Sequence, residues 1–132
     1  MKKLIGLAAL VALGLSAQTA EEHHQFMKDA GGAMRKMRTA LEAKSGSDLA
    51  SEAKKVSDAF AGVEKFWTKR GGADDAVKLS MDAKTAADQL AAAATAGNME
   101  ESAAKLKALG STCQGCHSAH REKLADGTYK IK

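Results

Sequence analysis

The chain has 132 residues, of which 27% are charged, and its formal net charge is +4. This length fits a single domain. Only three Phe, one Trp and one Tyr are aromatic, and they are not interleaved with the basic residues, so the positive charge does not indicate nucleic-acid binding. So few aromatic side chains also make a thin core, and a large buried cofactor would supply the missing apolar area.

Residues 1–20 have the parts of a secretory signal peptide. Two lysines near the start precede an apolar run, residues 4–15, and small residues surround the expected cleavage points after Ala17 or Ala20. The run is short for a membrane span, so an uncleaved membrane anchor is the less favoured alternative. We therefore expect an exported protein whose mature domain is residues 21–132.

The next two segments, residues 21–44 and 48–69, are predicted to be amphipathic helices. In each, apolar side chains recur at spacings of three and four, which is the period of one helix face. The first stripe is Met27, Ala30, Met34, Met37 and Leu41, and the second is Leu49, Ala53, Val56, Phe60, Val63 and Trp67. Ser47 or Asp48 is expected to cap the second helix.

Two more helices are predicted, over residues 74–96 and from Met99 to about Asp126, with residues 128–132 as a loose tail. The third stripe is Ala76, Leu79, Ala83, Ala86, Leu90 and Ala93, and the fourth is Ala103, Leu106, Gly110, Cys113, His117, His120 and Leu124. The chain has no proline, which favours long helices. Four amphipathic helices joined by short loops predict an all-α, antiparallel, up-down-up-down four-helix bundle.

The most informative motif is Cys113-Gln114-Gly115-Cys116-His117, the c-type haem attachment signature. Each thiol can add to one vinyl group of a haem, and the following histidine can ligate the iron as a neutral imidazole. On a helix, Cys113 and His117 share a face, here the predicted core face. We expect one covalent haem c enclosed at one end of the bundle, with Arg121 paired to a propionate because guanidinium matches carboxylate geometry.

Other uses of these cysteines compete poorly. A thioredoxin-type dithiol follows a strand, and no strand pattern is visible in the sequence. A structural zinc site needs four converging ligands, whereas Cys113, Cys116, His117 and His120 would all come from about two turns of one helix. A disulfide between Cys113 and Cys116 is geometrically awkward inside a helix.

At this point the chain resembles the class II c-type cytochromes, the cytochrome c′ family, and in particular its low-spin branch. The resemblance is carried by the attachment motif near the C-terminus, by Arg121 four residues after His117, and by the stretch Phe-Met-Lys-Asp-Ala-Gly-Gly-Ala-Met at residues 26–34. His120 stands where relatives commonly have an aromatic residue, and the loop after the second helix is shorter than is typical. The resemblance implies a periplasmic haem protein in which Met27 is the distal iron ligand, and a homodimer through the first two helices.

The second axial ligand has to come from the haem face opposite His117, and hence from another helix. That requirement excludes His120. Met27 is the predicted ligand, from the family position and its place on the apolar stripe, although ordinary core packing also suits methionine. His24, about one turn earlier, is a competitor. His23 and His24 are otherwise expected to be solvated, and the first helix also carries Met34 and Met37.

The axial ligands decide the predicted function. With His117 and Met27 both bound, the iron excludes small ligands, and the soft thioether stabilises the ferrous state; the protein then acts as a one-electron carrier for redox partner proteins. If Met27 only packs against the haem, the protein would instead bind or scavenge nitric oxide or carbon monoxide. A haem-free helical adaptor or sensor bundle is the third interpretation. An enzyme is not expected, because no acid–base constellation appears in the sequence.

Overall fold

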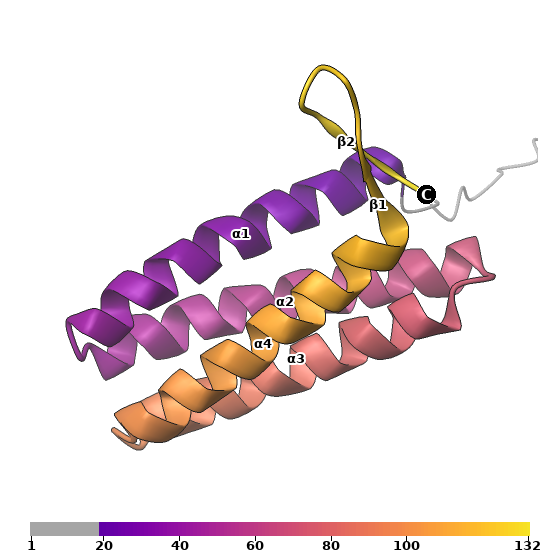
Figure 1. Ribbon diagram of the computed structural model, residues 1–132. Coiled ribbons are helices and arrows are strands. Elements are labelled where there is room, and N and C mark those ends of the chain that lie inside the picture. Colours follow the sequence, from indigo (N-terminus) through magenta and orange to yellow (C-terminus); the bar gives the residue numbers. More distant parts are fainter. Residues whose placement is uncertain (1–18) are drawn as a thin grey trace, which may run out of the picture.

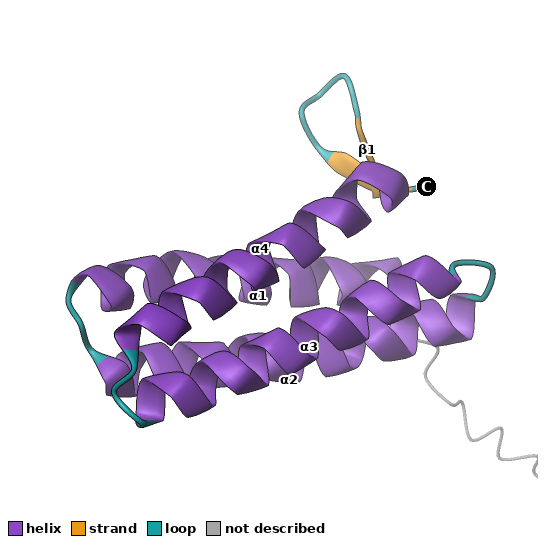
Figure 2. Cartoon of the chain, turned by 60° about the horizontal axis from the view of Figure 1, so that its bottom comes forward, coloured by secondary structure: helices purple, strands orange, loops and turns teal. Residues whose placement is uncertain are grey.

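A computed structural model describes residues 19–132. The predicted signal peptide, except its last two residues, lies outside the described residues. The described part of the chain forms four long helices and a small hairpin (Figures 1 and 2): α1 (Ala20–Glu42), α2 (Gly46–Arg70), α3 (Asp74–Thr95), α4 (Met99–His120), β1 (Arg121–Lys123) and β2 (Tyr129–Ile131).

The helices pack against one another in the order of the chain. Short connections turn the chain back each time, so α1 packs against α2, α2 against α3, and α3 against α4, with consecutive helices antiparallel (Figure 1). In contrast, α1 and α4 meet at only a few places. The predicted fold class is therefore confirmed as four helices packed together, and the enclosed haem stays a prediction.

The core follows the predicted stripes most closely in α2. All six residues of its stripe are buried, and Trp67 is only 2% exposed. Small side chains on α3, among them Ala76, Ala83 and Ala87, face this stripe and let the two helices approach closely. From α1, Met34 and Met37 complete the same core.

The start of α2 differs from the prediction. The helix begins at Gly46, and Ser45 takes the N-cap position with an extended backbone. The hydroxyl of Ser45 donates to a carboxylate oxygen of Asp48 at 2.8 Å instead of accepting from a backbone N–H. A Cβ at Gly46 would lie 2.6 Å from the carbonyl oxygen of Ala94. The start of α2 therefore lies close against the end of α3, and the predicted caps Ser47 and Asp48 lie inside the helix.

The end of α4 is also different, because the predicted extension to Asp126 and the loose tail are both wrong. The helix ends at His120, and Arg121 is extended, with φ of −128° and ψ of 130°. β1 then pairs antiparallel with β2. Between them, a carboxylate oxygen of Asp126 accepts from the backbone N–H of Thr128 at 2.9 Å, and Gly127 takes a left-handed φ of 86°. This turn chemistry closes the hairpin.

The buried face of α4 is rotated relative to the predicted stripe. Ser102, Leu106 and Leu109 are buried, whereas Ala103 is exposed. The hydroxyl of Ser102 is satisfied by donating to the carbonyl oxygen of Asn98 at 2.7 Å. Since α4 packs on α3 and hardly on α1, only its face toward α3 is buried. The predicted apolar stripe, which includes Ala103, therefore does not coincide with the buried face.

A close contact holds the first half of α1 against α2. The ring of Phe26 lies directly over the backbone of Gly62, where a Cβ would have three ring carbons within 2.7 Å. Gly62 is buried inside α2, so its missing side chain makes room for the ring. This contact positions the turn of α1 that also carries Met27.

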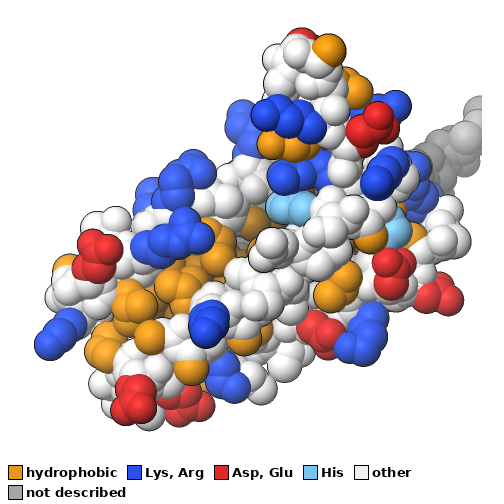
Figure 3. All heavy atoms as spheres, in the orientation of Figure 1, with side chains coloured by type: hydrophobic (Ala, Val, Ile, Leu, Met, Phe, Trp, Pro, Cys, Tyr) orange, Lys and Arg blue, Asp and Glu red, His pale blue; other side chains and the backbone are white. Residues whose placement is uncertain are grey.

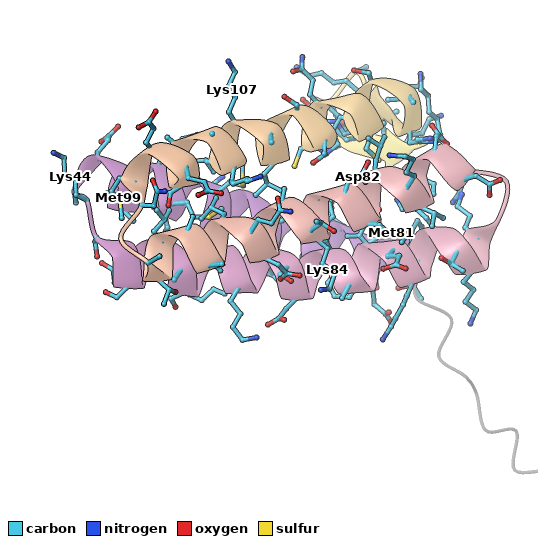
Figure 4. The ribbon with its side chains drawn as sticks, turned by 90° about the horizontal axis from the view of Figure 1, so that it is seen from below. Lys44, Met81, Asp82, Lys84, Met99 and Lys107 are labelled. Carbon is cyan, nitrogen blue, oxygen red and sulfur yellow. The ribbon has the colours of Figure 1, made fainter. Side chains whose placement is uncertain are left out.

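Charged side chains lie on the outside of the bundle. Lys107 on α4 points away from the other helices (Figure 4). Asp82 and Lys84 on α3 are partly exposed. Met81 is the exception on that surface, because it is apolar and 50% exposed. Within residues 19–132, no helix combines the length and the apolar character that a membrane span requires.

Candidate functional site

The residues singled out by the sequence meet at the hairpin end of the bundle. Because the helices alternate in direction, the start of α1, the end of α2, the start of α3 and the end of α4 all lie there (Figure 1). The loops at Lys44 and Met99 lie at the opposite end (Figure 4). The topology thus gathers side chains from four distant parts of the chain around the Cys113–His117 motif.

Both cysteines of the motif are half-buried and pack against the hydrophobic core. Neither forms a disulfide. Burial raises the pKa of the Cys113 thiol, and it raises the pKa of Cys116 to about 11, with the Asp75 carboxylate and Cys113 acting in the same direction. Both sulfurs are therefore neutral thiols at neutral pH, the opposite of the thiolates found in redox dithiols and zinc sites.

The imidazole of His117 is half-buried next to these thiols. Burial lowers its pKa, and the positive charge of Arg121 adds to the effect. At neutral pH the ring is therefore uncharged, which is the form that ligates a metal. Within residues 19–132, no three His, Cys, Asp or Glu side chains converge into a site that could hold a metal ion without a cofactor.

His120, one turn after His117, joins α4 to the start of α3. Its Nε2 lies 2.7 Å from a carboxylate oxygen of Asp75, and its ring centroid lies 4.9 Å from that of Trp67. The hydrogen bond from His120 is the main factor that lowers the pKa of Asp75; the ionised carboxylate accepts and the ring N–H donates. His120 is thus held against the start of α3.

On α1, the structure separates the two adjacent histidines. His24 is exposed, as expected, but His23 is half-buried, so the expectation that both are solvated is wrong for His23. Its ring centroid lies 4.6 Å from that of Phe66 and 5.6 Å from that of Trp67. His23 precedes Met27 by four residues, the spacing of one helix face, and this was the available signal that the sequence reasoning missed.

Met27 itself is partly buried and packs against the core. Its role as an iron ligand stays a prediction. The same holds for the predicted propionate contact of Arg121, which is exposed and places its guanidinium carbon 3.9 Å from the ring centroid of Tyr129. Arg121 thus sits where α4 gives way to the hairpin.

Trp67 contributes an unusual feature to this end of the bundle. Its indole N–H is buried and has no hydrogen-bond partner within the described residues. A buried donor left without an acceptor costs about 1–3 kcal/mol. An acceptor brought by a bound group, such as a carboxylate, would remove this cost. The rings of His23 and His120 both contact the indole.

The face between α1 and α4 is the least packed surface of the bundle. Figure 3 shows hydrophobic side chains exposed in a strip between these two helices, bordered by Lys and Arg, with histidine at its hairpin end. The half-buried thiols, the neutral His117, the unpartnered indole N–H and this apolar strip are together compatible with a haem attached to α4. The described residues therefore fit a haem, the group that the Cys113–His117 motif implies.

Among known proteins, no protein-family model matches the chain, and neither the curated proteins nor the solved structures contain a match. The resemblance to the cytochrome c′ family rests on the residues quoted above.

Proposed function

We propose that this chain is an exported, periplasmic mono-haem c-type cytochrome, similar to the cytochrome c′ family, that carries single electrons between redox partner proteins. The observation that carries the proposal is the Cys113–His117 motif on a half-buried face of α4, with both thiols and the imidazole neutral. Haem, when bound, supplies an iron that alternates between ferrous and ferric states.

The two cysteines provide the attachment. Each S–H would add across one vinyl double bond of the haem, with the sulfur on one carbon and the hydrogen on the other, so no group would leave and no net oxidation would occur. The neutral thiol state of Cys113 and Cys116 retains the hydrogen that this addition uses. Two anchors three residues apart on one helix also fix the group relative to His117.

The axial ligands set the chemistry. His117 supplies one imidazole, and α1, which faces α4 across the apolar strip, supplies Met27 from its partly buried face. A thioether is a soft ligand that favours the ferrous state and raises the reduction potential. With both positions filled by side chains, Met27 and His117 exclude small ligands and leave electron transfer as the activity.

The first test is the mass of the exported protein. We expect a gain of one haem that survives denaturation, and no gain in a variant carrying Cys113→Ser and Cys116→Ser. An exported wild-type chain of unmodified mass, despite co-expressed haem-attachment machinery, would refute the proposal and leave the haem-free adaptor or sensor bundle.

The second test separates an electron carrier from a gas-binding protein. We expect the ferric protein to show the red-region methionine–iron charge-transfer band, and the ferrous protein to show no spectral change with carbon monoxide. Met27→Ala should abolish the band, whereas Met81→Ala, which removes the exposed methionine of α3, should keep it. High-spin iron that binds carbon monoxide in the wild-type protein would instead favour nitric oxide or carbon monoxide binding.

A further inference from the structure

His23 lies at the hairpin end of the bundle, on the helix opposite the attachment motif. It is half-buried between α1 and α2, against the rings of Phe66 and Trp67. The same indole ring of Trp67 contacts the ring of His120 of α4, one turn after His117, with the ring centroids 4.9 Å apart. An imidazole of α1 and an imidazole of α4 therefore approach each other where α1 and α4 otherwise hardly touch.

The ring of His23 is also in a state that can ligate. Burial lowers its pKa to about 4, and the positive charge of Arg70 acts in the same direction. At neutral pH its ring therefore carries a free nitrogen lone pair. The exposed neighbour His24 lacks this surrounding of aromatic rings.

His23 and Met27 present two ligand types from the same face of one helix. They are four residues apart, about one turn, and both are partly buried. The start of α1 has little packing that would hold it against α4. Because helical side chains lean toward the helix N-terminus, the long Met27 side chain reaches back toward the turn of His23. Rotation of these two side chains would therefore exchange one for the other opposite His117 while α1 stays on α2.

We propose that His23 is a second, exchangeable iron ligand of this site, which takes the position opposite His117 whenever Met27 does not hold it. This inference rests on the proposed function. In the exchange, the bond from the Met27 sulfur breaks and a bond from a ring nitrogen of His23 forms, with no change in the number of electrons. Imidazole is a harder ligand than a thioether, so the exchange favours ferric iron and lowers the reduction potential.

The test uses three variants of the exported, haem-loaded protein: Met27→Ala, Met27→Ala with His23→Gln, and Met27→Ala with His24→Gln. Electron paramagnetic resonance and optical spectra of the ferric state report the spin state, and carbon monoxide binding reports an open position. We expect Met27→Ala to lose the methionine band yet stay low-spin, bind no carbon monoxide and have a lower reduction potential than Met81→Ala. The His23→Gln double variant should become high-spin and bind carbon monoxide, whereas the His24→Gln double variant should behave like Met27→Ala.

Added imidazole provides the check on folding. It should restore the low-spin spectrum of the His23→Gln double variant, because an intact site with one open position binds a free ligand. Failure to restore it would overturn the proposal, since the spectral change would then reflect a collapsed site. A high-spin Met27→Ala variant, or a His23→Gln double variant that stays low-spin, would also overturn it. Mass spectrometry keeps the two hypotheses apart: a protein without haem refutes the proposed function, whereas these spin-state results on a haem-loaded protein refute only the role of His23.

Discussion

The contact of Phe26 with Gly62 leads to a quantitative prediction for Gly62→Ala. The new methyl group would have three carbons of the Phe26 ring within 2.7 Å. Carbon atoms in ordinary contact are about 3.5–4.0 Å apart, so the ring would have to move by about 1 Å. Such overpacking costs about 1–3 kcal/mol, while alanine in place of glycine gains about 1 kcal/mol of helix propensity. We expect a net loss of about 1 kcal/mol in the free energy of unfolding.

Removing the ring should reverse the sign. In a Phe26→Ala background the methyl group has space, so Gly62→Ala should stabilise by about 1 kcal/mol, which makes the coupling between the two sites about 2 kcal/mol. Urea unfolding followed by helical circular dichroism measures all four proteins. Gly110→Ala is the matched control, because a Cβ at this helical glycine has nothing within 4 Å and should stabilise in both backgrounds. A coupling below about 0.5 kcal/mol would show that Phe26 does not rest on Gly62.

Three further predictions concern the core, the pH dependence and the hairpin. Leu109 is fully buried one turn before Cys113, so Leu109→Ala should lower the urea-unfolding free energy by about 2–5 kcal/mol, and a loss under about 1 kcal/mol would argue against the packing of α4 on α3. The hydrogen bond donated by Ser57 is the main cause of the lowered pKa of Asp88; such a group stabilises above the ordinary carboxyl pKa of 3.8, and this contribution is lost as the pH falls through the folded-state value. Asp88→Asn should therefore flatten the fall in stability toward acid pH, and an unchanged slope would contradict this role. Arg121 stacks on Tyr129, an exposed contact of about 0.5–1 kcal/mol, so Tyr129→Ala should speed amide exchange in residues 121–131 about threefold and leave α2 unchanged; equal exchange in both proteins would show that the stacking adds nothing.

Much of the helical architecture could be predicted because it depends on local order. The spacing of apolar residues in α2 corresponds to one buried face, and all six predicted positions are buried. The Gly97-Asn98 break between α3 and α4 also depends on local contacts. The side chain of Asn98 accepts from the N–H of Glu101 at 3.0 Å and caps the start of α4. Periodicity and capping act within a few residues, so they can be read without knowing the partner helices.

The sequence predictions are wrong where contacts between residues distant in the chain decide the helix ends and the buried faces. α2 starts early, where its first turn meets the end of α3 near Ala94. α4 buries Ser102 in place of Ala103 because it packs on one neighbour only. The chain beyond His120 forms a hairpin because Arg121 pairs across the turn with Ile131 and stacks on Tyr129. None of these partners lies within the window that a helical pattern covers.

For the site, the sequence alone predicts the chemistry of attachment: the spacing of Cys113, Cys116 and His117 indicates thioether bonds and one axial imidazole. Only the tertiary structure decided which side chains surround this motif. It buried His23 against α2, joined His120 to Asp75 and left the indole N–H of Trp67 without a partner in residues 19–132. The physical reason is that covalent spacing is a property of consecutive residues, whereas burial and electrostatic environment depend on how antiparallel helices bring distant turns to one end of the bundle.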